Sequence, residues 1–278
     1  MEILGLLLAA AAVLFGLYLL AIRPARTGRV SKERRRSCCF AHRGLHDNRS
    51  DAPENSLRAF ERAIEAGYGI EMDVRLTRDG VPVIFHDASL KRMCGYEGHV
   101  EDMTHAELKE FRLLGTDQRI PDLQEVLKLT DGKVPLLIEY KMDSNDASVC
   151  ICAERLLKNY RGFYCMESFH PFALLWYRHN RPEILRGILS TDYSRSKGTG
   201  NPGIALLHFI SRHLLFNFFT KPDFIAYDCM VKKALSRKLC RKVYGSILAA
   251  WTVKSPEQLK QLETEYDWFI FEGFMPTK

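Results

Sequence analysis

The sequence predicts an α/β protein, a (β/α)₈ TIM barrel that follows one N-terminal transmembrane helix. The chain of 278 residues opens with a long uncharged apolar run, and its 46% hydrophobic and 27% charged residues are otherwise typical of a globular protein. From residue 38 onward, short β-rich apolar runs alternate with stretches of helical pattern, as in βα units around a parallel sheet. Eight such runs within about 240 residues fit the size of a TIM barrel.

Residues 3–22 are the first element, a run of twenty residues without a charge. At 1.5 Å per residue, a helix of this length spans the roughly 30 Å hydrocarbon core of a bilayer. A cleaved signal peptide is the alternative, but it requires a basic start, a shorter apolar stretch and a small-residue cleavage site. Only Met1 and Glu2 precede the run and arginines follow it. We therefore expect residues 1–22 to be an uncleaved, single-pass membrane anchor.

A basic linker, residues 23–37, follows the anchor. It carries seven Arg or Lys side chains against the single acid Glu33, so it accounts for the formal net charge of +6. Because the basic residues lie only on this side of the anchor, the positive-inside rule predicts that the domain after the linker faces the cytoplasm. The linker is either simply solvated or in contact with anionic head groups, at about 1 kcal/mol per basic residue. No aromatic side chains interleave with these charges, which disfavours nucleic-acid binding.

Cysteine usage agrees with a cytoplasmic domain. The chain has eight cysteines, a density that does not suggest a disulfide scaffold at this length. No pair of C-x-x-C units exists, so a structural zinc site of that type is not expected. Reduced thiols are the simplest interpretation.

Strands and helices are expected to alternate through the barrel, residues 38–278. The expected strands span 39–42, 70–75, 134–140, 163–168, 184–189, 224–227, 246–251 and 268–271. The expected helices span 54–66, 147–160, 172–179, 231–242 and 256–265. The first helix has the clearest boundaries, since Pro53 precedes it, an acid lies in its first turn and Gly67 follows its end.

Two stretches are longer than one βα unit requires. Residues 81–130 are expected to hold an extra short strand at 83–86 and helices near 104–111 and 123–129. An insertion at about 190–222 begins with polar and Gly-rich residues and continues with the apolar run GIALLHFISRHLLFNFF. This run is either a helix packed on the rim of the barrel or an interfacial helix that rests on the bilayer beside the anchor.

Acidic residues occur at predicted strand ends, where functional residues of TIM barrels lie. Glu71 and Asp73 are two apart on one strand, so they face the same side, and Glu139 lies near the end of the next long strand. Carboxylates that converge repel one another unless a cation lies between them. Three acids without Cys or His suit one hard divalent cation, Mg²⁺ or Ca²⁺. Exposed acids at a loop mouth would give the same local pattern.

Two histidines and two basic residues accompany the acids. His42 ends the first strand and His86 follows the extra strand, with Arg43 and Lys141 close by in the sequence. A pair of histidines can remove one proton and donate another near neutral pH, whereas a lone histidine at a strand end is more often structural. Arg as a planar fork and Lys as a point charge supply the positive charge that a phosphodiester needs.

The motifs also occur in a characteristic order. They read AHRG at 41–44, APENS at 52–56, E-x-D-V at 71–74, HD at 86–87, I-P-x-L-x-E-V-L at 120–127 and I-E-x-K at 138–141, with weaker matches SF at 168–169 and WTV at 251–253. In order and spacing, the chain from about residue 40 to its end resembles the glycerophosphodiester phosphodiesterase family. The resemblance implies a TIM barrel that hydrolyses glycerophosphodiesters to glycerol 3-phosphate and an alcohol.

Site roles follow from the resemblance residue by residue. The general acid and base would be His42 and His86. One divalent cation would be held by Glu71, Asp73 and Glu139. The substrate would be bound by Arg43, Lys141, Glu54 and Trp251.

The chain departs from the family pattern at two places. The usual Thr-Asp-x-Pro segment at the last strand is replaced by Phe271-Glu272-Gly273-Phe274, and the apolar insertion before Pro222 lies outside the minimal pattern.

Three other functions also fit the motifs. A phosphodiester lyase would share the site but release a cyclic phosphate. A lysophospholipase D-type enzyme would act on a membrane lipid, and a non-catalytic lipid-head-group binder would not need both histidines. Soluble diesters and lysophospholipids both fit as substrates.

Overall fold

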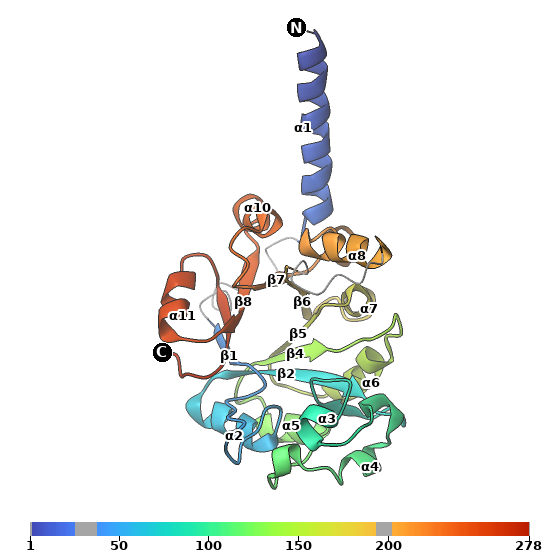
Figure 1. Ribbon diagram of the computed structural model, residues 1–278, viewed down its shortest axis with the longest axis vertical. Helices are drawn as coiled ribbons and strands as arrows, with labels where there is room; N and C mark the ends of the chain where they lie inside the picture. The colour runs from blue at the N-terminus through green and yellow to red at the C-terminus, as the bar shows by residue number, and fades with distance from the viewer. Residues whose placement is uncertain (1, 26–37, 193–201, 278) are drawn as a thin grey trace.

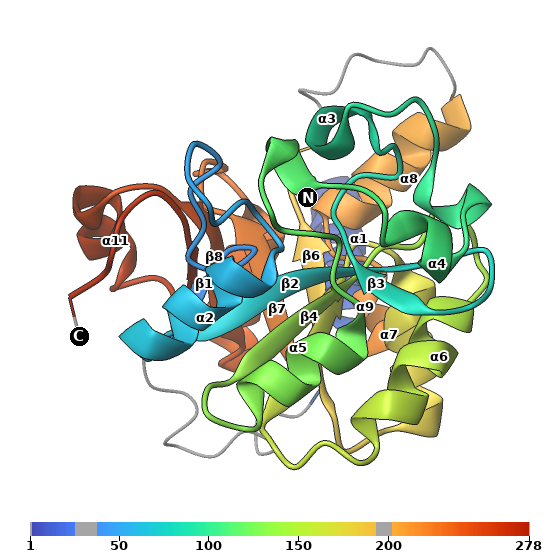
Figure 2. The ribbon, with the colours of Figure 1, turned by 90° about the horizontal axis from the view of Figure 1, so that it is seen from below.

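The barrel is closed by eight parallel strands in the described part of the chain (Figures 1 and 2). The structure, a computed structural model, describes residues 2–25, 38–192 and 202–277. The strands are β1 (Cys38–Ala41), β2 (Gly69–Leu76), β4 (Leu136–Tyr140), β5 (Tyr164–Ser168), β6 (Leu185–Ser190), β7 (Phe224–Asp228), β8 (Ile247–Val253) and β9 (Trp268–Phe271). Each pairs with the next around the ring, and β9 pairs with β1. The predicted TIM barrel is confirmed, with strand ends within two residues of those expected.

Helices cover the outside of this barrel. They are α2 (Leu57–Ala66), α5 (Leu123–Thr130), α6 (Ser148–Leu157), α7 (Pro171–Asn180), α10 (Leu235–Tyr244) and α11 (Pro256–Leu262). The helix predicted at 231–242 begins four residues later, at Leu235. The side chains of Val231 and Ala234, ahead of it, are buried in the core.

The start predicted for the first barrel helix, at residue 54, is wrong. Helix α2 begins at Leu57, and Ser56 is its N-cap because the Ser56 hydroxyl accepts a hydrogen bond from the Ala59 amide at 3.1 Å. A serine cap satisfies one of the free amides of the first turn, and this signal outweighs Pro53. Residues Glu54 and Asn55 therefore lie in the loop that leads to the helix, and both are buried.

The barrel interior has an apolar floor and a polar top. The floor includes Phe40, Leu137, Cys165, Phe224, Ala249, Trp268 and Ile270. Because side chains alternate along a strand, the residue two positions further on also points inward. This rule places His42 above Phe40, Glu139 above Leu137 and Glu167 above Cys165. The floor is packed closely: a Cβ at Gly187 would lie 2.1 Å from the Phe224 ring.

Residues 77–122 form a side lobe with its own apolar cluster. Its elements are β3 (Pro82–Ile84), α3 (Lys91–Cys94), η2 (Val100–Asp102), α4 (His105–Leu108) and η3 (Leu113–Gly115). The extra strand predicted at 83–86 is β3, which ends two residues earlier, at Ile84, and pairs antiparallel with β2. The helix predicted near 104–111 is a single turn, capped by Thr104 and Glu107. Phe85 anchors the lobe in its core, which fixes His86 at the mouth of the barrel.

Helix α1 (Glu2–Ile22) projects away from the barrel (Figure 1). Among the described residues it is the one helix long and apolar enough to cross a membrane. Several hydrogen bonds fix its C-terminal end to the barrel, among them Asn217 Nδ2 to the Ile22 carbonyl at 2.8 Å and Tyr244 OH to the Leu19 carbonyl at 2.8 Å. Just beyond the helix, the Ala25 amide donates to the Pro222 carbonyl at 2.9 Å. The barrel therefore contacts the C-terminal end of α1, and the rest of the helix extends away from it.

The apolar insertion forms α8 (Pro202–Arg212) and α9 (Asn217–Thr220) near the foot of α1 (Figure 1). Helix α8 packs on the barrel rim, where Ser190 Oγ and Tyr227 OH each donate to a carbonyl at its end at 3.0 Å. Its Leu206 and Phe209 are more than half exposed. Most of the predicted basic linker, residues 26–37, and residues 193–201 of the insertion lie outside the described residues.

Candidate active site

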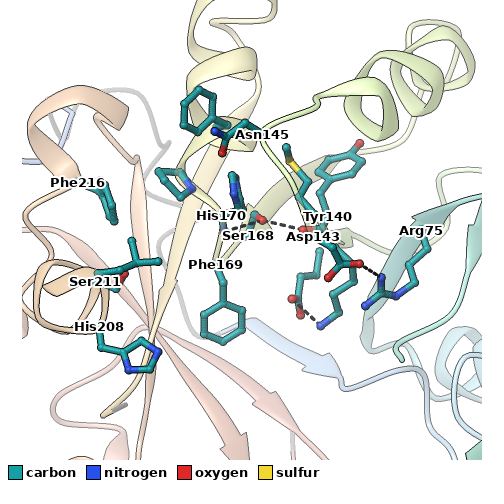
Figure 3. Close-up of a pocket in the computed structure, with 16 residues that line it drawn as sticks. Arg75, Tyr140, Asp143, Asn145, Ser168, Phe169, His170, His208, Ser211 and Phe216 are labelled. Atoms are coloured by element: carbon teal, nitrogen blue, oxygen red, sulfur yellow. Dashed lines mark hydrogen bonds and ion pairs between the residues drawn. The ribbon is translucent and has the colours of Figure 1, made fainter. Parts of the chain in front are cut away.

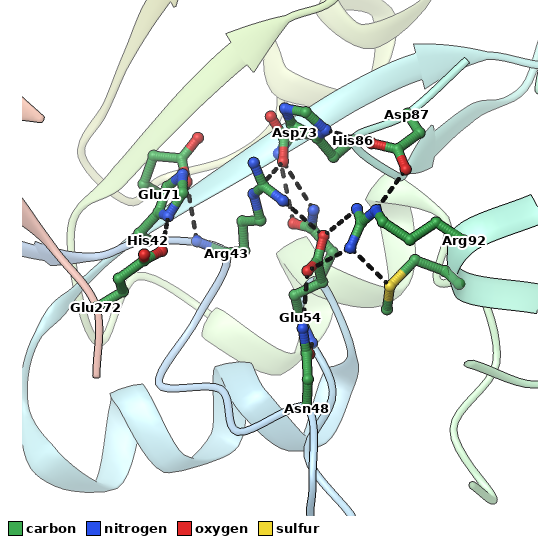
Figure 4. Close-up of polar contacts among 12 residues, drawn as sticks. His42, Arg43, Asn48, Glu54, Glu71, Asp73, His86, Asp87, Arg92 and Glu272 are labelled. Carbon is green, nitrogen blue, oxygen red and sulfur yellow. Dashed lines mark hydrogen bonds and ion pairs between the residues drawn. The ribbon is translucent and has the colours of Figure 1, made fainter. Parts of the chain in front are cut away.

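The charged residues singled out from the sequence meet at the carboxyl ends of the barrel strands (Figure 4). A cavity of about 130 Å³ lies there. Its walls include seven of the nine predicted site residues: His42, Arg43, Glu71, His86, Glu139, Lys141 and Trp251. The other two, Asp73 and Glu54, lie directly behind this wall in contact with Arg43.

Three buried carboxylates form the centre of the site. Glu71, Asp73 and Glu139 are 1%, 0% and 7% exposed, and one oxygen of each lies within 4.8 Å of an oxygen of the other two. Strand register explains this, because Asp73 and Glu139 are partners on β2 and β4. An oxygen-only, buried and convergent donor set fits a hard divalent cation.

The pKa values of these acids show how crowded the site is. Burial and the neighbouring carboxylates raise the pKa of Glu71 well above its usual value. Burial also raises the pKa of Glu139 to about 7, although Lys141 opposes the shift. Burial would raise the pKa of Asp73 too, but Lys141, His86 and Arg43 hold it well below its usual value. A bound divalent cation would favour the ionised form of all three acids.

Arg43 is placed by a tight turn just after β1. Its backbone has φ 55°, followed by Gly44 at φ 83°, a left-handed conformation that glycine adopts without strain. A Cβ at Gly44 would lie 2.9 Å from Ala59 atoms, so the turn packs directly against α2. The turn aims the Arg43 amide at Glu71, with N to Oε2 at 2.9 Å.

Glu54 holds the arginine in place from behind. Its carboxylate accepts from Arg43 Nη1 at 2.6 Å, from Arg92 at 2.7 and 2.9 Å, and from Asn48 at 3.0 Å (Figure 4). Burial would raise the pKa of Glu54, but the bonds from Arg92 and the charge of Arg43 hold it at about 2. Glu54 is thus ionised and positions the Arg43 side chain, so it would affect substrate binding through Arg43.

Lys141 bridges two of the central acids. Its Nζ lies 2.9 Å from Asp73 Oδ1 and 2.6 Å from Glu139 Oε1. Burial would lower the pKa of Lys141, but Asp73 and Glu139 raise it above its usual value, so the side chain stays positive. Asn55 adds a neutral contact, donating from Nδ2 to Asp73 Oδ2 at 2.8 Å.

Each of the two histidines is oriented by a carboxylate. His42 Nδ1 lies 2.7 Å from Glu272 Oε2, and His86 Nδ1 lies 2.6 Å from Asp87 Oδ1 (Figure 4). The bond from His42 lowers the pKa of Glu272, and that of Asp87 is also lowered, by its bonds to Arg92 and His86 against the effect of burial. Ionised carboxylates only accept hydrogen bonds, so Nδ1 carries the proton in both rings. Nε2 is then the nitrogen that carries the lone pair in each neutral ring.

Sequence reasoning missed two acids of the site. Glu272 had been noted only as a departure from the family pattern, and its contact with His42 joins positions 230 apart in the chain. Glu167 is 1% exposed and lines the cavity, and its Oε2 has no hydrogen-bond partner among the described residues. Burial, Glu71 and Glu139 raise its pKa well above the usual value. The alternation along β5 and β9, which puts both side chains inside, could have revealed them.

A larger and mainly apolar cavity adjoins the first (Figure 3). Its volume is about 460 Å³, and it shares Glu139, Lys141 and Phe169 with the cavity of the carboxylates. Its far wall contains Leu207 and Phe216 from the apolar insertion. Trp251, predicted to bind substrate, packs edge-on against Phe169 at 5.5 Å between ring centroids, at the boundary between the two cavities.

Comparisons with known proteins agree with this geometry. A model of the glycerophosphoryl diester phosphodiesterase family matches residues 42–272. A glycerophosphodiester phosphodiesterase of Caldanaerobacter subterraneus is 34% identical over 162 residues, which is 54% of this chain and 65% of that protein. The human glycerophosphodiester phosphodiesterase 1 is 27% identical over 269 residues, covering 86% of this chain and 78% of that protein.

A solved structure shows the same fold. It is a phosphodiesterase of Oleispira antarctica in complex with its product sn-glycerol-3-phosphate, with a TM-score of 0.68 and 24% identity over 84% of this chain and 92% of that one. The matches to the first bacterial relatives cover about two thirds of their length, 65–66%.

Fold and site together define a TIM barrel in which three convergent buried carboxylates are flanked by two carboxylate-oriented histidines. Such an arrangement suits cleavage of a phosphodiester, because cationic side chains, histidines and carboxylates that can hold a cation lie around one cavity. The chain belongs to the glycerophosphoryl diester phosphodiesterase family.

Proposed function

We propose that the chain is a metal-dependent phosphodiesterase that hydrolyses glycerophosphodiesters to glycerol 3-phosphate and an alcohol. One observation carries the proposal: a single cavity joins a buried group of three carboxylates to two histidines, each held by its own carboxylate. Family membership supports the choice of substrate class.

The cationic side chains and the carboxylates divide the binding of the phosphate. Arg43 and Lys141 line the cavity as fixed positive charges, and they would attract the phosphodiester monoanion. Glu71, Asp73 and Glu139 would hold one Mg²⁺ or Ca²⁺, which when bound stabilises the charge that develops on the phosphoryl oxygens. The edge of Trp251 and Phe169 would contact the rest of the substrate.

His42 and His86 would carry the protons. One Nε2 takes a proton from the attacking oxygen, a glycerol hydroxyl or a water molecule, as the new P–O bond forms. The other histidine gives a proton to the alcohol oxygen as the old P–O bond breaks. If the glycerol hydroxyl attacks the phosphorus, a cyclic phosphate forms, and a water molecule must open it in a second step. If water attacks directly, one step is enough. Either route therefore consumes one water molecule.

The test uses the full-length chain in detergent with glycerophosphocholine as substrate. Release of glycerol 3-phosphate should require added divalent cation and stop with EDTA. His42→Ala should lower kcat by about 10²–10⁴-fold, the usual contribution of a positioned general acid or base. His179→Ala, which removes an exposed histidine on α7, is the matched control. An equally active His42→Ala variant would refute the proposal, and a cyclic phosphate as final product would favour a lyase.

A lysophospholipid is a second candidate substrate, favoured by the adjoining apolar cavity. Phe169, Phe172 and Leu207 line a space beside the phosphate-binding residues where one acyl chain would be shielded from water. Leu207→Asp should therefore reduce activity on lysophosphatidylcholine at least about tenfold more than on glycerophosphocholine. Equal losses on both substrates would exclude this role for the cavity.

We also propose that the foot of α1 rests at a membrane surface. Leu206 and Phe209 of α8 and Phe218 and Phe219 of α9 are 51–59% exposed. Helix α9 contacts α1, and α8 lies near the foot of α1 (Figure 1). Exposed apolar side chains at this level suit the head-group region. The test uses a chain that lacks residues 2–18 and measures its binding to anionic vesicles. Substituting both Phe209 and Phe219 by Ser should weaken this binding, and unchanged binding would refute the surface contact.

The basic residues after α1 support a cytoplasmic catalytic domain. Protease added to sealed cells should then leave the barrel intact, and should cut it after permeabilisation. Cleavage in sealed cells would place the barrel on the other side.

A further inference from the structure

A second group of potential metal ligands lies on the other side of His42 from the three acids. One donor atom each from His42, His46 and Glu272 lies within 4.8 Å of the other two. His46 and Glu272 border an open cavity of about 850 Å³, whereas His42 borders the cavity of the carboxylates. The His42 ring therefore stands between the two cavities, with Nδ1 on the side of Glu272 (Figure 4).

His46 has no partner that explains its position. Both of its ring nitrogens are buried and lack a hydrogen-bond partner among the described residues. Leaving a buried polar atom unsatisfied costs about 1–3 kcal/mol, so such groups usually serve a bound water, an ion or a chemical function. The nearby groups that can satisfy this imidazole through a shared ligand are His42 and Glu272.

We propose that His42, His46 and Glu272 form a second cation site, one that takes Zn²⁺ or a similar borderline-soft ion and stops catalysis. Two imidazoles and one carboxylate are a typical zinc donor set, with a water molecule in the fourth position. The oxygen-only group of Glu71, Asp73 and Glu139 prefers a harder ion. The chain thus distinguishes two classes of cation on the two sides of one histidine.

The geometry needs only a small adjustment. Tetrahedral zinc with bonds near 2.0–2.1 Å places its donor atoms about 3.4 Å apart. The present spread reaches at most 4.8 Å, so the His46 ring must move inward by about 1 Å. No hydrogen bond of its ring opposes this movement among the described residues. Glu272 Oε2 must also withdraw from His42 Nδ1, from 2.7 Å to about 3.4 Å, while Lys254 Nζ holds the other Glu272 oxygen at 2.8 Å.

Zinc at this site would act on His42 directly. To bind the metal, the neutral His42 ring takes the other tautomer: its proton moves from Nδ1 to Nε2, Nδ1 donates its lone pair to zinc, and the hydrogen bond to Glu272 is replaced by a Zn–O bond. Nε2 then carries the proton of the ring and has no lone pair with which to accept another, so His42 is lost as a base. The inhibitory part of the inference rests on the proposed function, whereas the binding part does not.

The experiment compares the untagged full-length protein with His46→Ala and His46→Asn, all in saturating Mg²⁺. Co²⁺ is the spectroscopic probe, because four-coordinate Co²⁺ with nitrogen ligands absorbs in the visible range, and Zn²⁺ is the inhibitor. In the parent protein, one equivalent of Zn²⁺ should displace Co²⁺ and inhibit. Both variants should retain kcat without zinc but need at least about tenfold more Zn²⁺ for binding and for half inhibition.

The outcomes separate this site from the carboxylates. Glu139→Gln replaces one ligand of the group of three acids, so it should need more Mg²⁺ for activity but keep the Co²⁺ absorption of the second site. This absorption does not depend on activity, so it tests the second site even if the proposed function is wrong. Equal zinc affinity in the parent and in both His46 variants would overturn the second site. The second site would also be overturned if the Zn²⁺ concentration for half inhibition rose in proportion to the Mg²⁺ concentration, because zinc would then compete with Mg²⁺ at the three acids.

Discussion

Glu272→Gln tests whether the carboxylate beside His42 controls catalysis. The substitution keeps the size of the side chain and removes its charge. A hydrogen bond to a charged group contributes about 1.5–3 kcal/mol, and a neutral bond about half as much. The bond between His42 Nδ1 and Glu272 Oε2 is 2.7 Å long, with side chains 18% and 23% exposed, so solvent competes only in part.

From these values, about 0.8–1.5 kcal/mol of orientation and charge stabilisation should be lost, which is a decrease in kcat of about 4- to 13-fold. The amide can also donate to Nδ1 and favour the wrong tautomer, which would increase the loss further. KM should change less than about twofold, because Glu272 does not line the cavity of the carboxylates.

The assay is release of glycerol 3-phosphate from glycerophosphocholine under saturating Mg²⁺, with thermal unfolding of each variant as a check on folding. Glu272→Asp keeps the charge and should recover part of kcat. Lys254→Gln is the matched control, because this 69% exposed side chain contacts the other Glu272 oxygen at 2.8 Å, and it should cost less than about threefold. An unchanged kcat in Glu272→Gln would refute the reasoning, as would equal losses in Gln and Asp variants of normal stability.

Three other predictions follow from the same structure. Glu139→Gln should raise the Mg²⁺ or Ca²⁺ concentration for half-maximal activity at least about tenfold; an unchanged requirement would exclude Glu139 as a ligand. In EDTA, the melting temperature should fall as pH rises from about 4.5 to 7, because burial raises the folded-state pKa of Glu139 to about 7 and the folded chain then binds the extra proton. Glu139→Gln should flatten this slope, and a slope of opposite sign would contradict the assignment. Phe224→Ala should lower the free energy of unfolding by about 3–5 kcal/mol, because the ring is fully buried in the barrel floor; a loss below about 1 kcal/mol would show that the floor repacks.

Much of the barrel was predictable because its signals are local. Each strand is a short apolar run, and the alternation along β2 already places Glu71 and Asp73 on one face. The end of a strand is visible in the sequence as well, so His42 and Glu139 could be assigned to the functional end of a barrel before any pairing was known. Family resemblance, itself a set of local motifs in order, added the chemistry.

Local signals failed where two of them competed. Pro53 and the acid after it indicated a helix start at residue 54, yet Ser56 caps α2 and Glu54 turns inward to two arginines. The role of Glu54 depends on Arg92, which comes from the side lobe 38 residues later. Sequence spacing does not encode that contact.

The sequence by itself determined the strands, the apolar N-terminal helix and the identity of the acids and histidines, because these follow from period, charge and order along the chain. Only the tertiary structure decided which of them act on one another. Glu272 reaches His42 because β9 closes the ring against β1, and Leu207 reaches the cavity beside Lys141 because the insertion folds back over the rim. Closure of the barrel, a property of all eight strands together, sets the first contact, and the packing of the insertion on the rim sets the second; neither is a property of one local run of residues.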